Sequence, residues 1–240
     1  MIRSKYLVGV LLLCILVAFV YKQNPYRIEF LGNYHKIWAH KINSLERLQK
    51  ASKHFKGIEL DLVYDSAKGV LDISHPPAPL SGLSFLEYAK LLPKDPSFGI
   101  WLDIKNLNAS NASEILNLVT IALKKTSIQT HQIIIESRYP EGLPLFTNAG
   151  YSISYYLPYN ISEEKTATKE AHIKNIKSII LAQPTIAISS SYKDYNFMKT
   201  HFPNTTKYLW MIDGIGAHGF QASEILKDPT VAILLVKFKG

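Results

Sequence analysis

Two apolar segments of the chain carry charged side chains at every second position. In residues 58–62 Glu59 and Asp61 alternate with aliphatic residues, and in residues 100–105 Asp103 and Lys105 do the same. Successive side chains of a β-strand point to opposite faces, so each segment predicts a strand with one apolar and one charged face. Buried carboxylates are costly unless a cation or hydrogen bonds compensate them.

The three acids, Glu59, Asp61 and Asp103, therefore predict a site for a hard divalent cation, Mg²⁺ or Ca²⁺, which prefers oxygen ligands. Two other interpretations stay open from the pattern alone. Lys105 could pair with one of the acids in a structural ion pair, or the segments could be edge strands with one face in water.

Two histidines extend this hypothesis. His40 ends a predicted strand, and His75 follows a short predicted strand at residues 70–74. Imidazole changes charge near neutral pH, so two histidines beside a metal could act as general base and general acid. A single histidine at a strand end is more often a hydrogen-bonded structural residue, but the joint spacing of the two favours a shared role. Another predicted strand ends with Glu136, Ser137 and Arg138, which could line the same pocket; for Arg138 a surface position is the alternative.

The elements that must position these residues alternate along the chain from about residue 36. The predicted strands are 37–40, 58–64, 100–105, 132–137, 151–156, 185–190, 208–213 and 231–237, and the predicted helices are 44–54, 84–92, 110–125, 162–180, 194–201 and 221–227. This alternation predicts a compact (β/α)8 TIM barrel, with an open doubly wound sheet as the alternative. In a barrel the apolar strand faces meet the helices, and residues at the carboxyl ends of strands surround the active site.

Composition narrows the class of protein. The chain has 240 residues, 47% of them apolar, and a single cysteine, which excludes an intramolecular disulfide. The formal net charge is +8, but the lysines are scattered and no common nucleic-acid motif is present, so nucleic acid is not expected as a partner. Such a charge favours partners with anionic headgroups or phosphate groups. A basic surface that is only solvated is the alternative.

The N-terminal segment is typical of a targeting signal. Residues 6–21 are uncharged, and Arg3 and Lys5 precede them. No cleavage site with small residues follows, so we predict an N-terminal hydrophobic helix that is an uncleaved signal anchor within residues 1–24 and a single domain at 25–240. The positive flank places that domain outside the cytoplasm, anchored to a membrane; a cleaved signal and a secreted domain are the alternative.

The order of the candidate residues resembles a known superfamily. His40, Glu59-x-Asp61, His75 and Asp103-x-Lys105 are similar to motifs of the glycerophosphodiester phosphodiesterase and phosphatidylinositol phospholipase C-like superfamily. Within it, residues 39–44, 59–61, 75–77 and 99–105 look most like the menorin family. The resemblance covers roughly residues 37–107, with Trp210 placed like a tryptophan on the penultimate strand of the diesterases.

This resemblance implies a (β/α)8 barrel with roles for particular residues. It implies Glu59, Asp61 and Asp103 as metal ligands, His40 and His75 as the catalytic acid and base, Lys105 as a phosphate contact, and Trp210 as part of the substrate pocket. The diesterases commonly have His-Arg-Gly at the first site, whereas here Lys41 follows His40 and would supply the positive charge without the planar fork of arginine.

Two functions remain open from the sequence. The favoured one is a metal-dependent phosphodiester hydrolase that acts on glycerophosphodiesters or lipid headgroups. The alternative is a non-catalytic extracellular binding or adhesion module of menorin type, which would work through a protein partner. The presence of all three acids and both histidines together favours catalysis.

Overall fold

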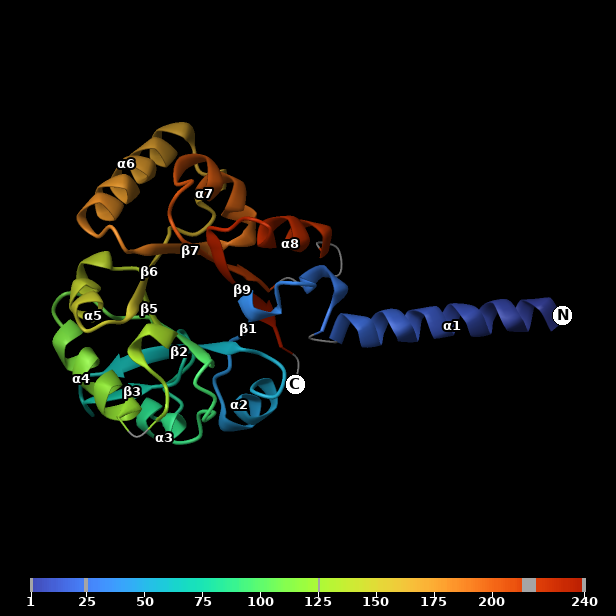
Figure 1. Ribbon diagram of the computed structural model, residues 1–240, viewed down its shortest axis with the longest axis horizontal. Coiled ribbons are helices and arrows are strands. Elements are labelled where there is room, and N and C mark those ends of the chain that lie inside the picture. Colours follow the sequence, from blue (N-terminus) through green and yellow to red (C-terminus); the bar gives the residue numbers. More distant parts are fainter. Residues whose placement is uncertain (1, 24–25, 125, 213–218, 239–240) are drawn as a thin grey trace.

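A closed barrel of parallel strands forms the body of the protein (Figure 1). The computed structural model describes residues 2–23, 26–124, 126–212 and 219–238. Within these ranges the eight barrel strands are β1 (Ile37–His40), β2 (Gly57–Asp65), β4 (Gly99–Ile104), β5 (Ile133–Ser137), β6 (Ser152–Tyr156), β7 (Ala187–Ser191), β8 (Lys207–Met211) and β9 (Val231–Lys237). The barrel closes because β1 pairs in parallel with both β9 and β2. The predicted (β/α)8 barrel is thus confirmed, and the open sheet is excluded.

Helices cover the outside of the barrel (Figure 1). They are α2 (Leu45–Ala51), α3 (Phe85–Ala89), α4 (Ala112–Leu123), α5 (Pro144–Asn148), α6 (Thr166–Ala182), α7 (Tyr195–His201) and α8 (Gly219–Leu226). The helix α5 was not predicted: it has five residues, as α3 has, but it lacks the side-chain cap that Ser84 gives α3. Residues 1, 24, 125 and 213, which fall in predicted elements, lie outside the described residues.

A short hairpin extends from the mouth of the barrel. The last residues of β2 run beyond its parallel partners and pair in antiparallel fashion with β3 (Val70–Asp72), where Val63 faces Asp72 and Asp65 faces Val70. Because β3 runs back along β2, the chain that follows it returns toward the carboxyl end of the barrel. The hairpin therefore brings His75 to the level of the acids on β2.

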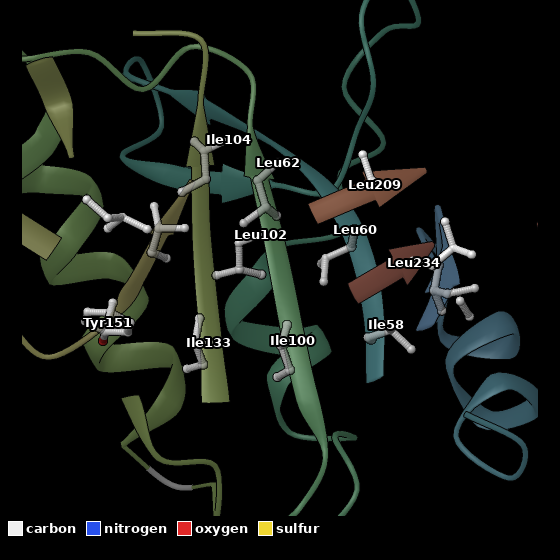
Figure 2. Packing of buried hydrophobic residues seen from close by; sticks show 14 of the residues in the cluster. Ile58, Leu60, Leu62, Ile100, Leu102, Ile104, Ile133, Tyr151, Leu209 and Leu234 are labelled. Atoms are coloured by element: carbon white, nitrogen blue, oxygen red, sulfur yellow. The ribbon is translucent and has the colours of Figure 1, made fainter. Parts of the chain in front are cut away.

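The barrel strands separate two apolar cores. Between strands and helices, the aliphatic side chains of β2 and β4 are fully buried, as Figure 2 shows for Ile58, Leu60, Leu62, Ile100, Leu102 and Ile104. Inside the barrel lies a second cluster, which includes Trp38, Trp101 and Tyr208. The charged residues of β2 and β4 share the inward face with this second cluster, as the alternation predicts.

Two glycines make room for the indole ring of Trp38 inside the barrel. Gly57 and Gly99 face each other on β2 and β4. A Cβ atom would lie 2.2 Å from the Trp38 ring at either position. Replacing Gly57 by Ala is therefore expected to lower the free energy of unfolding by about 1–3 kcal/mol, the usual cost of overpacking a core.

Chemical denaturation measures this effect. A double-mutant cycle with Trp38→Leu is the control, because removal of the large ring should make Gly57→Ala nearly neutral. An unchanged denaturation midpoint for Gly57→Ala alone would show that the ring is free to move.

The N-terminal helix α1 (Ile2–Gln23) lies outside the barrel (Figure 1). Its uncharged run of 16 residues extends about 24 Å, less than the ~30 Å hydrocarbon core of a bilayer. In the described part of the chain, no helix combines the length and the apolar character needed to cross a membrane. The predicted membrane anchor is therefore without structural support, and the location outside the cytoplasm stays a prediction.

Candidate active site

Three carboxylates meet at the carboxyl ends of β2 and β4. Asp61 and Asp103 are register partners on these neighbouring strands, and Glu59 lies two residues before Asp61 on the same face. One oxygen from each lies within 4.8 Å of the others. The exposed fractions of Glu59, Asp61 and Asp103 are 2%, 2% and 8%. Since β2 and β4 are paired on both sides within the barrel, the alternative of a wet edge strand is wrong.

One lysine lies among these acids. The Lys105 Nζ is 2.6 Å from Asp61 Oδ1 and also forms an ion pair with Asp103. Among the described residues, Lys105 is the lysine whose ammonium contacts the cluster, so there is one ammonium for three carboxylates. Burial, with the charges of Asp61 and Asp103, raises the pKa of Glu59 well above its usual range. Burial also raises the pKa of Asp103. When all three acids are ionised, their negative charge exceeds the single charge that Lys105 offsets.

Neighbouring polar groups orient the carboxylates. The Lys41 backbone N–H donates to Glu59 Oε2 at 2.6 Å, from a left-handed conformation with φ of 57°. The Asn43 side-chain amide donates to Asp61 Oδ2 at 2.7 Å, and its Oδ1 accepts from the Asp61 N–H at 3.0 Å. These contacts hold both acids of β2 toward Asp103. An all-oxygen set with surplus negative charge fits a hard divalent cation such as Mg²⁺ or Ca²⁺.

Both predicted histidines lie beside the acids. His40 Nε2 is 3.6 Å from Glu59 Oε2, and His75 Nε2 is 3.9 Å from Asp61 Oδ1. Burial lowers the pKa of His40 to about 4, against the opposing charge of Asp61, so its imidazole is neutral at pH 7. The His75 side chain is 43% exposed. The site thus offers one sheltered neutral imidazole and one that solvent reaches.

A cavity of about 220 Å³ contains this cluster at the mouth of the barrel. It is lined by His40, Lys41, Glu59, Asp61, His75, Trp101, Asp103, Lys105, Glu136, Tyr156, Tyr159, Trp210, Ile212 and Leu235. Trp210 packs edge-on against Tyr156, with 4.8 Å between ring centroids. Nine of the eleven residues predicted for the site therefore border one cavity, with aromatic rings on one of its walls.

Ser137 and Arg138 are the two predicted site residues that do not border this cavity. Arg138 is exposed, and its guanidinium carbon lies 4.2 Å from the centre of the ring of Tyr156, a residue that lines the cavity. The strand β5 explains the difference, because Glu136 is its last inward-facing residue, while the Ser137 hydroxyl donates outward to the Leu107 carbonyl. Arg138 follows where the strand has ended and alternation no longer directs its side chain.

Glu136 forms the floor of the cavity with Trp101. Its carboxylate accepts hydrogen bonds from Trp101 Nε1 at 3.0 Å and from the Ser189 hydroxyl. Burial, together with the charge of Asp103, raises its pKa well above the usual range. Asn43, Tyr156 and Tyr159 were not predicted as site residues. Tyr156 could have been found by its place at the end of a strand, whereas Asn43 and Tyr159 lie in loops without a comparable signal.

No family model and no curated protein matches the sequence. Solved structures do resemble it. A glycerophosphodiester phosphodiesterase from Parabacteroides distasonis matches 84% of this chain and 92% of its own at 15% identity, with a TM-score of 0.58. One from Thermotoga maritima matches 85% and 94% at 14% identity, also with a TM-score of 0.58.

An Oleispira antarctica phosphodiesterase in complex with the product sn-glycerol-3-phosphate matches 87% of this chain and 95% of its own, at 12% identity and a TM-score of 0.55. At such low identities these similarities establish the shared barrel fold. They do not test the finer resemblance to the menorin family, which stays a prediction.

Proposed function

We propose that this protein is a metal-dependent phosphodiester hydrolase of the glycerophosphodiester phosphodiesterase superfamily, acting on glycerophosphodiesters or lipid headgroups. The observation that carries the proposal is the meeting of three buried acids, two histidines and a lysine in one cavity at the mouth of the barrel. The barrel fold shared with solved glycerophosphodiester phosphodiesterases supports it. Within the superfamily, the motifs of residues 37–107 favour the menorin-like branch. No structural observation favours the non-catalytic alternative.

The buried acids account for the metal requirement. A divalent cation held by Glu59, Asp61 and Asp103 would polarise a phosphoryl oxygen and offset the charge that develops on it. Lys105 contributes a fixed positive charge: burial acts against it, but Asp103 and Asp61 raise its pKa above the usual range. Its ammonium can donate to a nonbridging phosphate oxygen as a point charge.

Each of the two histidines carries out one proton transfer of the reaction. His40 is neutral at pH 7 because burial lowers its pKa to about 4, so it can accept the proton of a substrate hydroxyl next to the phosphate. That oxygen then attacks phosphorus and forms a cyclic phosphate, while the bond to the leaving oxygen breaks. His75, on the exposed side of the same acids, donates a proton to that leaving oxygen. Direct attack by water, with the same two proton transfers, is a variant.

Removal of divalent cations tests the proposal. The full chain, assayed with glycerophosphoglycerol, is expected to release sn-glycerol-3-phosphate or its cyclic form with Mg²⁺ or Ca²⁺ present, and to lose this activity in chelator. Cation binding should also raise the melting midpoint by about 5–10 °C at a concentration near 100 times Kd, because it compensates the buried carboxylates. Hydrolysis that is insensitive to chelator, without any shift in the midpoint, would contradict the proposal.

A further inference from the structure

A second, larger hollow adjoins the candidate active site. It has a volume of about 740 Å³ and lies between the loop after β1, the start of α2 and the end of β9. His40, Lys41 and Ile212 line both this hollow and the cavity with the acids. We call it the basic groove. Because these three residues line both spaces, the two spaces adjoin.

The lining of the basic groove is positively charged. Lys41, Arg47 and Lys237 contribute three cations, and no acidic side chain lines it among the described residues. The neighbouring cavity has the opposite character, since it holds four buried carboxylates. Two adjoining spaces with opposite charge fit a ligand whose two ends are bound in different ways.

Arg47 is held in place before any ligand arrives. Its Nη2 donates to the Phe238 carbonyl at 2.8 Å, and the guanidinium carbon lies 5.8 Å from the centre of the Phe238 ring. Its Nε is buried and has no hydrogen-bond partner in the described part of the chain. The proposed functions of the barrel acids use neither Arg47 nor Lys237. A guanidinium fixed in a groove without acids is suited to bind phosphate oxygens.

We propose that the basic groove binds a second anionic group on the alcohol of the substrate, such as a phosphate monoester. This inference rests on the proposed phosphodiesterase function and names its substrate class: diesters whose alcohol carries additional negative charge. The diester phosphate occupies the cavity with the acids, and the second phosphate lies against Arg47, Lys237 and Lys41. Diesters with a cationic alcohol, such as choline, are poorer substrates, because three like charges oppose them.

Paired substrates test this inference. Glycerophosphoglycerol and its phosphate monoester differ only in the second phosphate. With the full chain, we expect kcat/KM for the monoester to be at least about tenfold higher, the effect of one charge-assisted hydrogen bond. Vesicles of phosphatidylcholine that contain phosphatidylglycerol or phosphatidylglycerol phosphate form a second pair, which distinguishes a lipid substrate from a soluble one.

A variant with Arg47→Gln and Lys237→Gln should lose this preference and still hydrolyse glycerophosphoglycerol as the unmodified protein does. Hydrolysis of that substrate also shows that the variant is folded. Lys53→Gln makes the same kind of change at an exposed position outside the groove, and should keep the preference. Equal kcat/KM for the two soluble diesters in the unmodified protein would overturn the inference and leave the proposed function standing.

A direct binding measurement separates the two proposals if the protein hydrolyses no diester. Glycerol 1,3-bisphosphate has two phosphates and no diester bond, so calorimetry can follow its binding without turnover. We expect binding that weakens at least about tenfold in the Arg47→Gln, Lys237→Gln variant. Such binding without hydrolysis of any diester would support the groove and contradict the proposed function. Binding that is unchanged in the variant would overturn the groove.

Discussion

Replacing Glu59 by Gln is expected to lower kcat/KM for glycerophosphodiesters by at least about 10³-fold, because metal polarisation supplies several kcal/mol to the transition state. Glu59 is buried and lies within 4.8 Å of the two other acids. The amide has nearly the same shape but no charge, so the variant keeps the volume of the site. Steady-state kinetics over a range of Mg²⁺ concentrations measure the effect.

Thermal melting separates this loss from a loss of fold. The metal-free Glu59→Gln protein should melt at least as high as the metal-free unmodified protein, since it lacks one of the charges that raise the energy of the buried cluster. Added cation should no longer raise its melting midpoint. Glu46→Gln is the matched control, because Glu46 is an exposed acid on α2 whose partner is Lys50. Retention of both activity and the cation-dependent shift in Glu59→Gln would exclude Glu59 as a ligand.

Replacing His40 by Ala is expected to lower kcat by about 10²–10⁴-fold, the usual contribution of general acid or base catalysis. Its Nε2 lies 3.6 Å from Glu59 Oε2 in the cavity. The pH profile gives a second test. Because burial lowers the pKa of His40 to about 4, the neutral base persists in mild acid, and a bound cation would lower this pKa further. At a saturating cation concentration, which keeps Glu59 and Asp103 ionised, the acidic limb of kcat/KM should therefore lie well below the ordinary histidine pKa of about 6.5.

His131→Ala is the matched control for this variant. His131 is exposed and lies just before β5, at the amino end of the barrel, so its replacement should leave kcat and the pH profile unchanged. Cation binding by His40→Ala should persist, since its acids are intact. Full activity of His40→Ala at neutral pH would assign the base role to another group.

Much of the barrel follows from local patterns. The predicted strand β1 has the observed bounds, and β2 and β4 differ from their predictions by no more than one residue at each end. These strands are predictable because their aliphatic positions must all face the helices, and a shift by one residue would bury the charges among them. The helix α5 escaped prediction because it is short and has no capping side chain before it, whereas the equally short α3 has Ser84.

The site is predictable to the extent that strands direct it. Glu59, Asp61, Asp103 and His40 lie on strands whose carboxyl ends share one mouth, so alternation alone indicates that they meet. Arg138 lies one residue beyond its strand, where alternation no longer applies, and the structure places it outside the cavity.

The sequence by itself determined which faces of the strands are charged, because side-chain alternation is a local property of the backbone. Only the tertiary structure decided how the barrel closes, where β1 pairs with β9 and Arg47 meets Phe238 across 191 positions of the chain. Closure brings Lys237 beside Lys41 and Arg47 and creates the basic groove. No local pattern encodes that proximity, since it results from the packing of the whole barrel.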